Sequence, residues 1–394
     1  MLMKRILIGS AALFSMGLFY FFTWGARHID QLLNLVARPP HCEASRDAKE
    51  LHQRLLIADL HCDLLLWQRD PLAMARYGHV DVPRLIKGNV TLQVFSVVTK
   101  VPWGMNYERN SGVSDITAPL VVAQRWPMGT WFGLRERALY QARRFHSAVA
   151  RSQGKLVFIG SAGDLKNHIE RRRRDPDAVA GILSVEGLHA LEGELANVNV
   201  LYRAGFRMMA PSHFFDNEVG GSAHGLRKGG LTMFGRRVIA RMEELNIIVD
   251  LAHASPRMTD DILAMVTRPV VVSHTGVRGT CESLRNLNDQ QIVRIARSGG
   301  VVGIGFWQGA VCGNDVTSIV RAISYVADLV GVDHVALGSD FDGATRTPLD
   351  AAGLVCMTEA LSVAGFTESD VYKIMGGNTL RLLMEALPDG VGRK

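Results

Sequence analysis

The stretch Ile57-Ala58-Asp59-Leu60-His61-Cys62-Asp63-Leu64 decides the fold that this chain is predicted to adopt. It has the composition of a short, mostly apolar strand, and it carries a histidine and an aspartate two residues apart. Because successive side chains of a strand point to opposite faces, His61 and Asp63 project from the same face. An imidazole and a carboxylate at the end of one strand can hold a divalent metal ion. An isolated His-x-Asp often occurs by accident, so a metal site is indicated only if later strands end in the same way.

Further apolar stretches along the 394 residues read as strands, with helix-like stretches between them. The predicted strands cover residues 57–63, 90–98, 181–186, 207–213, 247–253, 270–274, 301–306 and 335–340. The expected helices include residues 164–173, 234–245, 258–266, 290–297, 317–330, 352–364 and 369–386. Strands that alternate with helices in this way predict an α/β fold, a (β/α)8 TIM-type barrel. A doubly wound open sheet is the alternative, although no glycine-rich dinucleotide fingerprint follows the first strand.

Residues 99–154 separate the second predicted strand from the third. They begin irregularly, with Pro-Trp-Gly-Met-Asn-Tyr at 102–107, and residues 134–150 favour a helix. A segment of this length is too long for a simple connection. We therefore expect it to lie over the mouth of the barrel.

Residues 1–26 are predicted to form an N-terminal membrane anchor or signal. Lys4 and Arg5 precede an uncharged, mostly apolar run at residues 6–25, and about 20 such residues suffice to cross a bilayer. Trp24 stands where a signal cleavage site requires a small residue, so the run favours an uncleaved transmembrane helix. Basic residues flank the run on both sides, which makes its orientation only weakly defined. We expect a membrane-anchored, extracytoplasmic protein, periplasmic if the source is a Gram-negative bacterium.

The remaining chain is expected to consist of a linker with a lead-in helix at 27–54 and a catalytic barrel domain at 55–388. Its net charge of +6 includes four consecutive arginines at residues 171–174. Such a short basic run is typical of a solvated helix end, and no aromatic residues interleave with it as in a groove for single-stranded nucleic acid. No nucleic-acid partner is therefore expected.

Most of the predicted strands end on a side chain that can bind a metal ion. These side chains belong to His61, Asp63, Glu186, His213, His253, His274 and Asp340. In a barrel of this type the carboxyl ends of the strands carry the chemistry. Nitrogen and carboxylate donors without thiolate suit Zn²⁺, with Mn²⁺ and Fe²⁺ as competitors. The set exceeds the needs of one catalytic zinc ion and suits two ions that share a carboxylate and a hydroxide.

Several short motifs resemble those of a known family. They are Asp-Leu-His-Cys-Asp at 59–63, Val-Glu-Gly at 185–187, Asp-Leu-Ala-His-Ala-Ser at 250–255, Ser-His at 273–274, Gly-Ser-Asp-Phe-Asp-Gly at 338–343 and Ile-Met-Gly-Gly-Asn-Thr-Leu-Arg at 374–381. In this order, from about residue 52 to 386, the chain resembles the membrane (renal-type) dipeptidases. These are binuclear zinc peptidases of the amidohydrolase superfamily. The resemblance implies zinc-dependent hydrolysis of dipeptides by a hydroxide that bridges the metal ions.

The same resemblance implies a ligand set for two zinc ions per chain. His61 and Asp63 would hold one ion, and His253 and His274 would hold the other. Glu186 would bridge the two ions and so take part in catalysis.

Other residues are implied to handle the substrate. His213 would bind the scissile carbonyl or the tetrahedral oxyanion, and Arg285 would clamp the free carboxylate of the dipeptide. Asp340 would pass a proton from the attacking water to the leaving amine, and could also meet the free amino group of the substrate. Asp342 follows the same strand period, but the turn is expected to divert it, while Asp59 is expected to support the metal ligands from behind.

The cysteines allow one further prediction. Cys281 and Cys312 lie in loops that follow neighbouring predicted strands at the same face, so a disulfide between them is geometrically plausible in an oxidising compartment. Cys62 points away from the ligands and is expected to pack against a helix. Cys42 and Cys356 have no obvious partner.

Two alternatives to a dipeptidase stay open at this stage. A binuclear metal N-acyl amino acid deacylase, or another amidohydrolase, would use the same metal centre on a different amide. A membrane-tethered binding protein on an inactive barrel is disfavoured because every required position is filled. Members of the resembled family often form homodimers, and the sequence adds nothing to that expectation.

Overall fold

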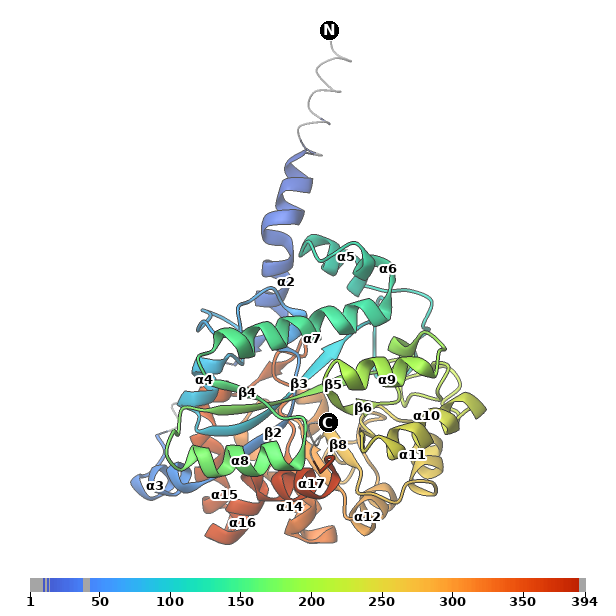
Figure 1. Ribbon diagram of the computed structural model, residues 1–394. Helices are drawn as coiled ribbons and strands as arrows, with labels where there is room; N and C mark the ends of the chain where they lie inside the picture. Colours follow the sequence, from blue (N-terminus) through green and yellow to red (C-terminus); the bar gives the residue numbers. More distant parts are fainter. Residues whose placement is uncertain (1–9, 11–12, 14, 38–42, 390–394) are drawn as a thin grey trace.

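The described residues form a central sheet of nine parallel strands, eight of which follow one another in a continuous series; we describe the protein from a computed structural model (Figure 1). The structure describes residues 10, 13, 15–37 and 43–389. In spatial order the eight strands of the series are β7(Ile248–Val249), β6(Phe206–Ala210), β5(Val179–Glu186), β3(Val90–Val98), β2(Ile57–Cys62), β10(Val335–Leu337), β9(Val301–Ile304) and β8(Val271–Thr275). The sheet curls until its outer strands meet, where the Leu251 N–H donates to the Val271 carbonyl at 2.7 Å. This arrangement agrees with the predicted TIM-type α/β fold.

Helices surround the sheet and connect its strands. They are α2(Ala26–Leu33), α3(Arg46–Arg54), α4(Val82–Lys87), α5(Thr117–Ala123), α6(Gly129–Phe132), α7(Leu134–Arg151), α8(Ala162–Arg172), α9(Ala196–Arg203), α10(Met233–Glu244), α11(Pro256–Leu263), α12(Asp289–Arg297), α13(Gln308–Val311), α14(Val316–Val330), α15(Val355–Val363), α16(Glu368–Tyr372) and α17(Asn378–Ala386). Shorter helical turns are η1(Phe21–Gly25), η2(Leu64–Leu66), η3(Leu188–Leu191), η4(Val332–His334), η5(Ala351–Gly353) and η6(Lys373–Gly377). Because helices cover the outside, the barrel strands are buried on both faces and read as continuous apolar runs.

Each predicted strand overlaps one strand of the sheet, although several observed strands are shorter than predicted. β7 has two residues, and the predicted strand 247–253 continues as a loop that carries His253 with a left-handed φ of 63°. Three short strands were not predicted. β4(Leu156–Phe158) pairs with β5, while β1(Leu35–Val36) pairs with β11(Arg346–Thr347) in a separate two-stranded sheet.

Side-chain caps fix where several helices begin. The Asn288 side chain accepts from the Gln291 N–H and the Gln291 side chain accepts in return, which forms a capping box at α12. Ser255 and Asp315 cap α11 and α14 in the same general way. These helices follow loops at the carboxyl edge of the sheet, so their caps also limit where those loops can run.

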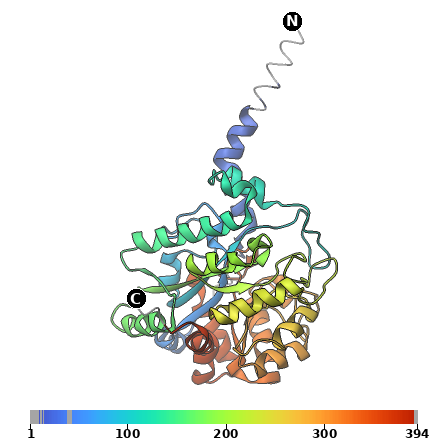
Figure 2. The ribbon, with the colours of Figure 1, turned by 45° about the vertical axis from the view of Figure 1, so that its right-hand side comes forward.

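Residues 99–154 form the predicted elaboration. α5 and α6 lead into the long helix α7, and in Figures 1 and 2 these helices lie at the same end of the molecule as the N-terminal helix. Arg137 of α7 is buried and donates to the carbonyl oxygens of Thr99 and Thr130 at 2.7 and 2.6 Å. It also pairs with Asp115 at 2.6 Å. One guanidinium therefore holds three parts of this segment together.

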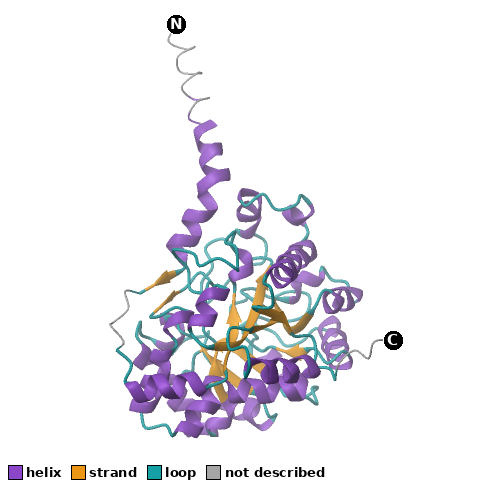
Figure 3. Cartoon of the chain, turned by 60° about the vertical axis from the view of Figure 1, so that its left-hand side comes forward, coloured by secondary structure: helices purple, strands orange, loops and turns teal. Residues whose placement is uncertain are grey.

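The predicted membrane anchor falls partly on residues outside the described ones, namely 1–9, 11–12 and 14. Among the helices that are described, none combines the length and the apolar character needed to span a bilayer. Residues 15–20, η1 and α2 continue one another as a helix that projects from the body of the protein (Figure 3). A transmembrane helix in this region thus stays a prediction.

The disulfide between Cys281 and Cys312 is confirmed, with Cα atoms 5.3 Å apart. Cys62 is buried as a free thiol, as expected. Cys356 is also disulfide-bonded, although the sequence offered no obvious partner for it. Cys42 lies outside the described residues.

Candidate metal centre

Glu186, the last residue of β5, lies at the centre of the predicted site. Its Oε1 atom is 2.8 Å from His253 Nε2 and 3.2 Å from His274 Nε2. Its Oε2 atom is 3.2 Å from His213 Nε2 and 3.9 Å from His61 Nε2. All of these side chains are buried. The two oxygens of one carboxylate therefore face two different sets of imidazoles.

Two aspartates complete the side of the cluster nearest His61. The Nε2 atom of His61 lies 3.5 Å from Asp63 Oδ1 and 3.9 Å from Asp340 Oδ1. The structure therefore brings all five predicted metal ligands together. His213 and Asp340, which were predicted to act on the substrate, lie equally close to the cluster and could reach a metal ion as well.

The arrangement of the donor atoms suits a bound metal ion better than direct hydrogen bonding between the side chains. His61 Nε2, Asp63 Oδ1 and Glu186 Oε1 are buried and have no hydrogen-bond partner among the described residues. Leaving such atoms unsatisfied is costly, and native proteins usually avoid it. His253 Nε2 and His274 Nε2 lie 3.1 Å apart. Two nitrogens bound to one tetrahedral zinc ion at about 2.0–2.1 Å would lie at a similar separation.

Charge in the cluster is arranged around Glu186. Burial by itself raises the pKa of Glu186, but the facing imidazoles of His213, His253 and His61 hold that pKa well below its usual range. Burial lowers the pKa of His253 and of His274 well below the ordinary value, and Arg285 adds to the effect. A lowered pKa favours the neutral imidazole, which is the form that binds metal ions.

His61 behaves differently from His253 and His274. Burial lowers its pKa, but Asp63 and Glu186 together raise that pKa to about 10. Without a metal ion His61 therefore carries a proton that compensates the carboxylates. A divalent cation would take over this role and displace the proton.

A serine behind the cluster orients two of the imidazoles. Ser273 Oγ lies 2.9 Å from His274 Nδ1 and 3.3 Å from His61 Nδ1, so the Nε2 atoms of both rings point toward Glu186. Asp59 was expected to support the ligands, but it accepts from the N–H and hydroxyl of Ser339 at 2.8 and 2.7 Å. It thus holds the residue next to Asp340, and no hydrogen bond joins it to a ligand imidazole of the described cluster.

Arg285 is buried without a carboxylate partner among the described residues. Its Nη2 atom donates to the His274 carbonyl at 2.6 Å, and its guanidinium lies 5.4 Å from the ring centre of Trp307. Burial lowers the pKa of Arg285. A buried guanidinium that is satisfied only by neutral groups suits an anionic ligand, because a carboxylate can accept from it in bidentate geometry.

Aromatic residues cover the cluster, and sequence reasoning did not identify them as part of the site. Trp307 Nε1 donates to the Tyr107 hydroxyl at 2.7 Å, and Tyr107 stacks on Phe214 with ring centres 6.5 Å apart. The Phe214 and Trp307 rings lie 5.1 and 5.9 Å from the rings of His253 and His274. The only available signal was the aromatic content of the irregular stretch 102–107, which does not say where that stretch folds back.

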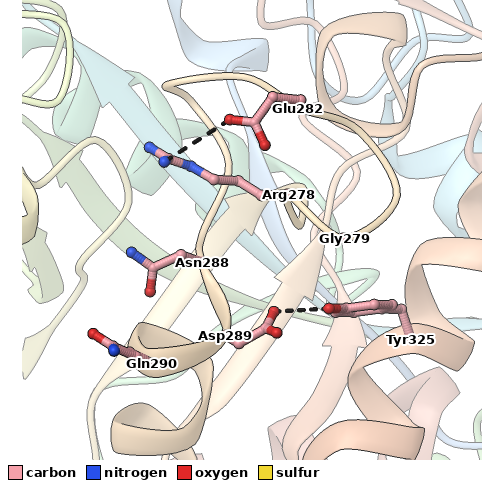
Figure 4. A pocket seen from close by; sticks show the side chains of 7 residues that line it. All are labelled: Arg278, Gly279, Glu282, Asn288, Asp289, Gln290 and Tyr325. Atoms are coloured by element: carbon pink, nitrogen blue, oxygen red, sulfur yellow. Dashed lines mark hydrogen bonds and ion pairs between the residues drawn. The ribbon is translucent and has the colours of Figure 1, made fainter.

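A separate surface pocket lies on the loop after β8. It is lined by Arg278, Gly279, Glu282, Asn288, Asp289, Gln290 and Tyr325 (Figure 4). The Tyr325 hydroxyl donates to Asp289 at 2.8 Å, and Arg278 pairs with Glu282 at 3.9 Å. None of the predicted catalytic or metal-binding residues lines it, so we do not assign it to the metal centre.

The fold and the site together define a metal-dependent hydrolase of the TIM-type architecture. More specifically, the chain belongs to the membrane dipeptidase family (Peptidase family M19), whose family model matches residues 45–388. The predicted resemblance is thereby confirmed.

The chain is also similar to individual proteins. An uncharacterized protein in the pqqA 5′ region of Klebsiella pneumoniae is 34% identical over 250 residues, which are 60% of this chain and 90% of that protein. The probable dipeptidase PvdM from Pseudomonas aeruginosa has a similar fold, with a TM-score of 0.73, 18% identity and coverage of 87% of this chain and 98% of that one. A metallo peptidase from Rhodobacter sphaeroides, liganded with a phosphinate mimic of the dipeptide L-Ala-D-Ala, has a TM-score of 0.66 and 25% identity over 84% of this chain and 99% of that one.

Proposed function

We propose that this protein hydrolyses the peptide bond of dipeptides, using two zinc ions held at the carboxyl end of its sheet. The observation that carries the proposal is the position of Glu186, whose two carboxylate oxygens face different histidines. A relative that binds a dipeptide mimic supports the same class of substrate. His61 and Asp63 would hold one ion, His253 and His274 the other, and Glu186 would bridge them. When bound, the ions would make hydroxide available near neutral pH and polarise the scissile carbonyl.

The protein's own side chains would do the remaining work. His213 would donate a hydrogen bond to the carbonyl oxygen of the substrate as negative charge develops there. Asp340 would accept a proton from the attacking water and deliver it to the leaving nitrogen. Arg285 would hold the C-terminal carboxylate. Recognition of that carboxylate next to the scissile bond would restrict the enzyme to short substrates.

A substrate panel tests the proposed activity. We expect the purified full chain with zinc to hydrolyse unblocked dipeptides and to leave N-acetylated amino acids largely intact. Faster cleavage of the N-acetylated compounds would instead favour the deacylase alternative. A folded, zinc-loaded protein that cleaves none of these amides would favour the binding-protein alternative and refute the proposal.

Replacing Arg285 with methionine is expected to weaken dipeptide binding selectively. Methionine keeps the apolar stem of the side chain but can neither donate hydrogen bonds to a carboxylate nor balance its charge. Loss of charge-assisted hydrogen bonds worth about 3 kcal/mol in total would raise KM for a dipeptide about 100-fold. The matched control is Arg278→Met on the same loop, which should leave KM unchanged. A dipeptide amide, which lacks the carboxylate, should be cleaved equally by wild type and Arg285→Met; a KM difference with this substrate would contradict the assigned role.

We also propose that residues 1–26 anchor the enzyme to a membrane. The catalytic domain, residues 55–388, would lie on the outer side of that membrane and form a homodimer. Among the described residues of the projecting helix, Leu13, Phe19 and Trp24 expose 68%, 59% and 50% of their surfaces. The disulfide at Cys281 is of the kind found in oxidising compartments. We expect the wild-type full chain to sediment with membranes after alkaline extraction. The double variant Leu13→Lys/Phe19→Lys should be released into the supernatant. Equal release of the wild type and the double variant would contradict the proposed anchor.

A further inference from the structure

Residues 26–37, comprising α2, β1 and the residues between and after them, form a segment that we call the N-terminal strap. This segment precedes the part of the chain that matches the family model, which begins at residue 45. It nevertheless lies against the loop that carries Asp340, and Figure 3 shows its short strand beside β11 near the base of the projecting helix. The strap therefore connects the N-terminal helix to the catalytic edge of the sheet.

A chain of buried ions joins the strap to this loop. Asp30 of α2 accepts from Arg69 Nε at 2.9 Å, and Arg69 Nη2 pairs with Asp342 Oδ2 at 2.6 Å. The side chains of Arg69, Asp30 and Asp342 expose only 5%, 3% and 0% of their surfaces. Burial raises the pKa of Asp342, but Arg69 and His79 outweigh burial and lower it, so Asp342 is ionised. Asp342 is two residues from Asp340, and it is turned away from the metal cluster as the sequence predicted.

The strap holds the same loop at further points, through one side chain and through its backbone. The Asn34 side chain accepts from the Ala344 N–H at 2.9 Å. The Leu35 N–H donates to the Thr345 carbonyl at 3.3 Å, and the Ala37 N–H donates to the Thr347 carbonyl at 2.7 Å. The strap thus holds the loop through side chains and through main-chain pairing.

The loop has a backbone conformation that needs such support. Asp340, Asp342 and Ala344 have φ values of 60°, 63° and 57°, in the left-handed region that L side chains disfavour. Residues persist in that region only where the surrounding structure holds them. Two of the three, Asp342 and Ala344, are the residues that the ion chain and Asn34 hold. Gly78 provides space for the connection, since a Cβ atom there would lie 2.4 Å from Arg69 Nη1.

We propose that the N-terminal strap positions Asp340 for proton transfer through the connection Asp30–Arg69–Asp342. Asp30, Asn34 and Arg69 would act as positioning residues that touch neither substrate nor metal. The inference rests on the proposed function, because it takes the role of Asp340 from there. It adds that the segment leading to the N-terminal helix is part of the catalytic apparatus, so that an enzyme with an altered strap would keep its metal centre but lose turnover.

The test uses Asp30→Asn in the full chain, which keeps the size of the side chain and removes its charge. The first measurement is hydrogen exchange of residues 338–347, which does not depend on activity. We expect exchange there to accelerate at least about tenfold, while peptides around Glu186 and His253 stay unchanged. Asn34→Ala, which removes the acceptor for Ala344 without changing charge, should act in the same direction. Asp47→Asn, an acidic residue of α3 outside the strap, is the matched control.

The second measurement compares a dipeptide with its ester analogue, in which a 2-hydroxy acid replaces the second amino acid. A misplaced Asp340 should lower kcat for the amide about 10- to 100-fold, because small displacements of a catalytic group have effects of this size. It should affect the ester less, since an alkoxide is a much better leaving group than an amide anion and so depends less on proton transfer to the leaving atom. Three outcomes would each overturn the proposal. They are equal losses of kcat for the two substrates, unchanged hydrogen exchange of residues 338–347, and failure of both variants to fold with bound zinc. An inactive wild type would refute the proposed function alone, because the exchange measurement still decides whether the strap holds the loop.

Discussion

Glu186→Gln is expected to lose nearly all activity together with part of its bound metal. Glutamine has the same shape, but its amide presents only one good acceptor and carries no negative charge. The oxygen facing His253 and His274 and the oxygen facing His61 are then no longer equivalent donors. We expect kcat/KM to fall at least about 1,000-fold, more than the 10- to 100-fold typical when a residue outside the ligand set is removed. Bound zinc should fall from about two ions per chain toward one.

Metal analysis by mass spectrometry and dipeptide assays on the same preparation would check this prediction. Glu282→Gln is the matched control, because Glu282 is an exposed glutamate on the loop after β8. It should keep full activity and full metal content. A Glu186→Gln protein that retains two zinc ions and normal turnover would show that Glu186 does not bridge the ions.

The positions of the strand-end residues in the cluster could be predicted because they depend on local rules. Glu186 and His274 each lie in a buried apolar run, and the run's direction in a parallel sheet determines which end reaches the catalytic edge. His253 was found for a partly different reason. It lies beyond β7, in a loop, and its left-handed backbone turns the imidazole toward Glu186. The predicted residue therefore reaches the cluster although the strand assigned to it was too long.

The residues that were missed are placed by contacts between distant parts of the chain. Tyr107 reaches the cluster only because its loop folds back onto Trp307, 200 residues further along. Arg69 lies in an irregular stretch after β2 and becomes buried only because Asp30 and Asp342 approach it from opposite sides. No local periodicity or motif predicts such long-range contacts, since each contact depends on the packing of the complete barrel.

The cluster also shows why proximity alone does not separate metal ligands from catalytic groups. Asp340 lies 3.9 Å from His61 Nε2, and Asp63 lies 3.5 Å from the same atom. Both carboxyls are buried, and burial is the largest cause of the raised pKa of each. Their roles differ only if the ion is held by Asp63 and not by Asp340. Measuring metal content and turnover separately in substituted proteins can distinguish a metal ligand from a catalytic group.

Asp340→Asn is accordingly expected to keep both zinc ions and to lose turnover. The asparagine amide cannot accept the proton from the attacking water or protonate the leaving nitrogen, and loss of such a group typically lowers kcat by about 10² to 10⁴. KM for a dipeptide should change little, because Arg285 still holds the carboxylate. Asp333→Asn, which alters an exposed aspartate beside the opposite end of β10, is the matched control and should behave as wild type. If Asp340→Asn instead loses a metal ion in parallel with activity, Asp340 is a metal ligand. Another group of the cluster must then carry the proton. The first candidate would be His213, whose Nε2 atom lies 3.2 Å from Glu186 Oε2.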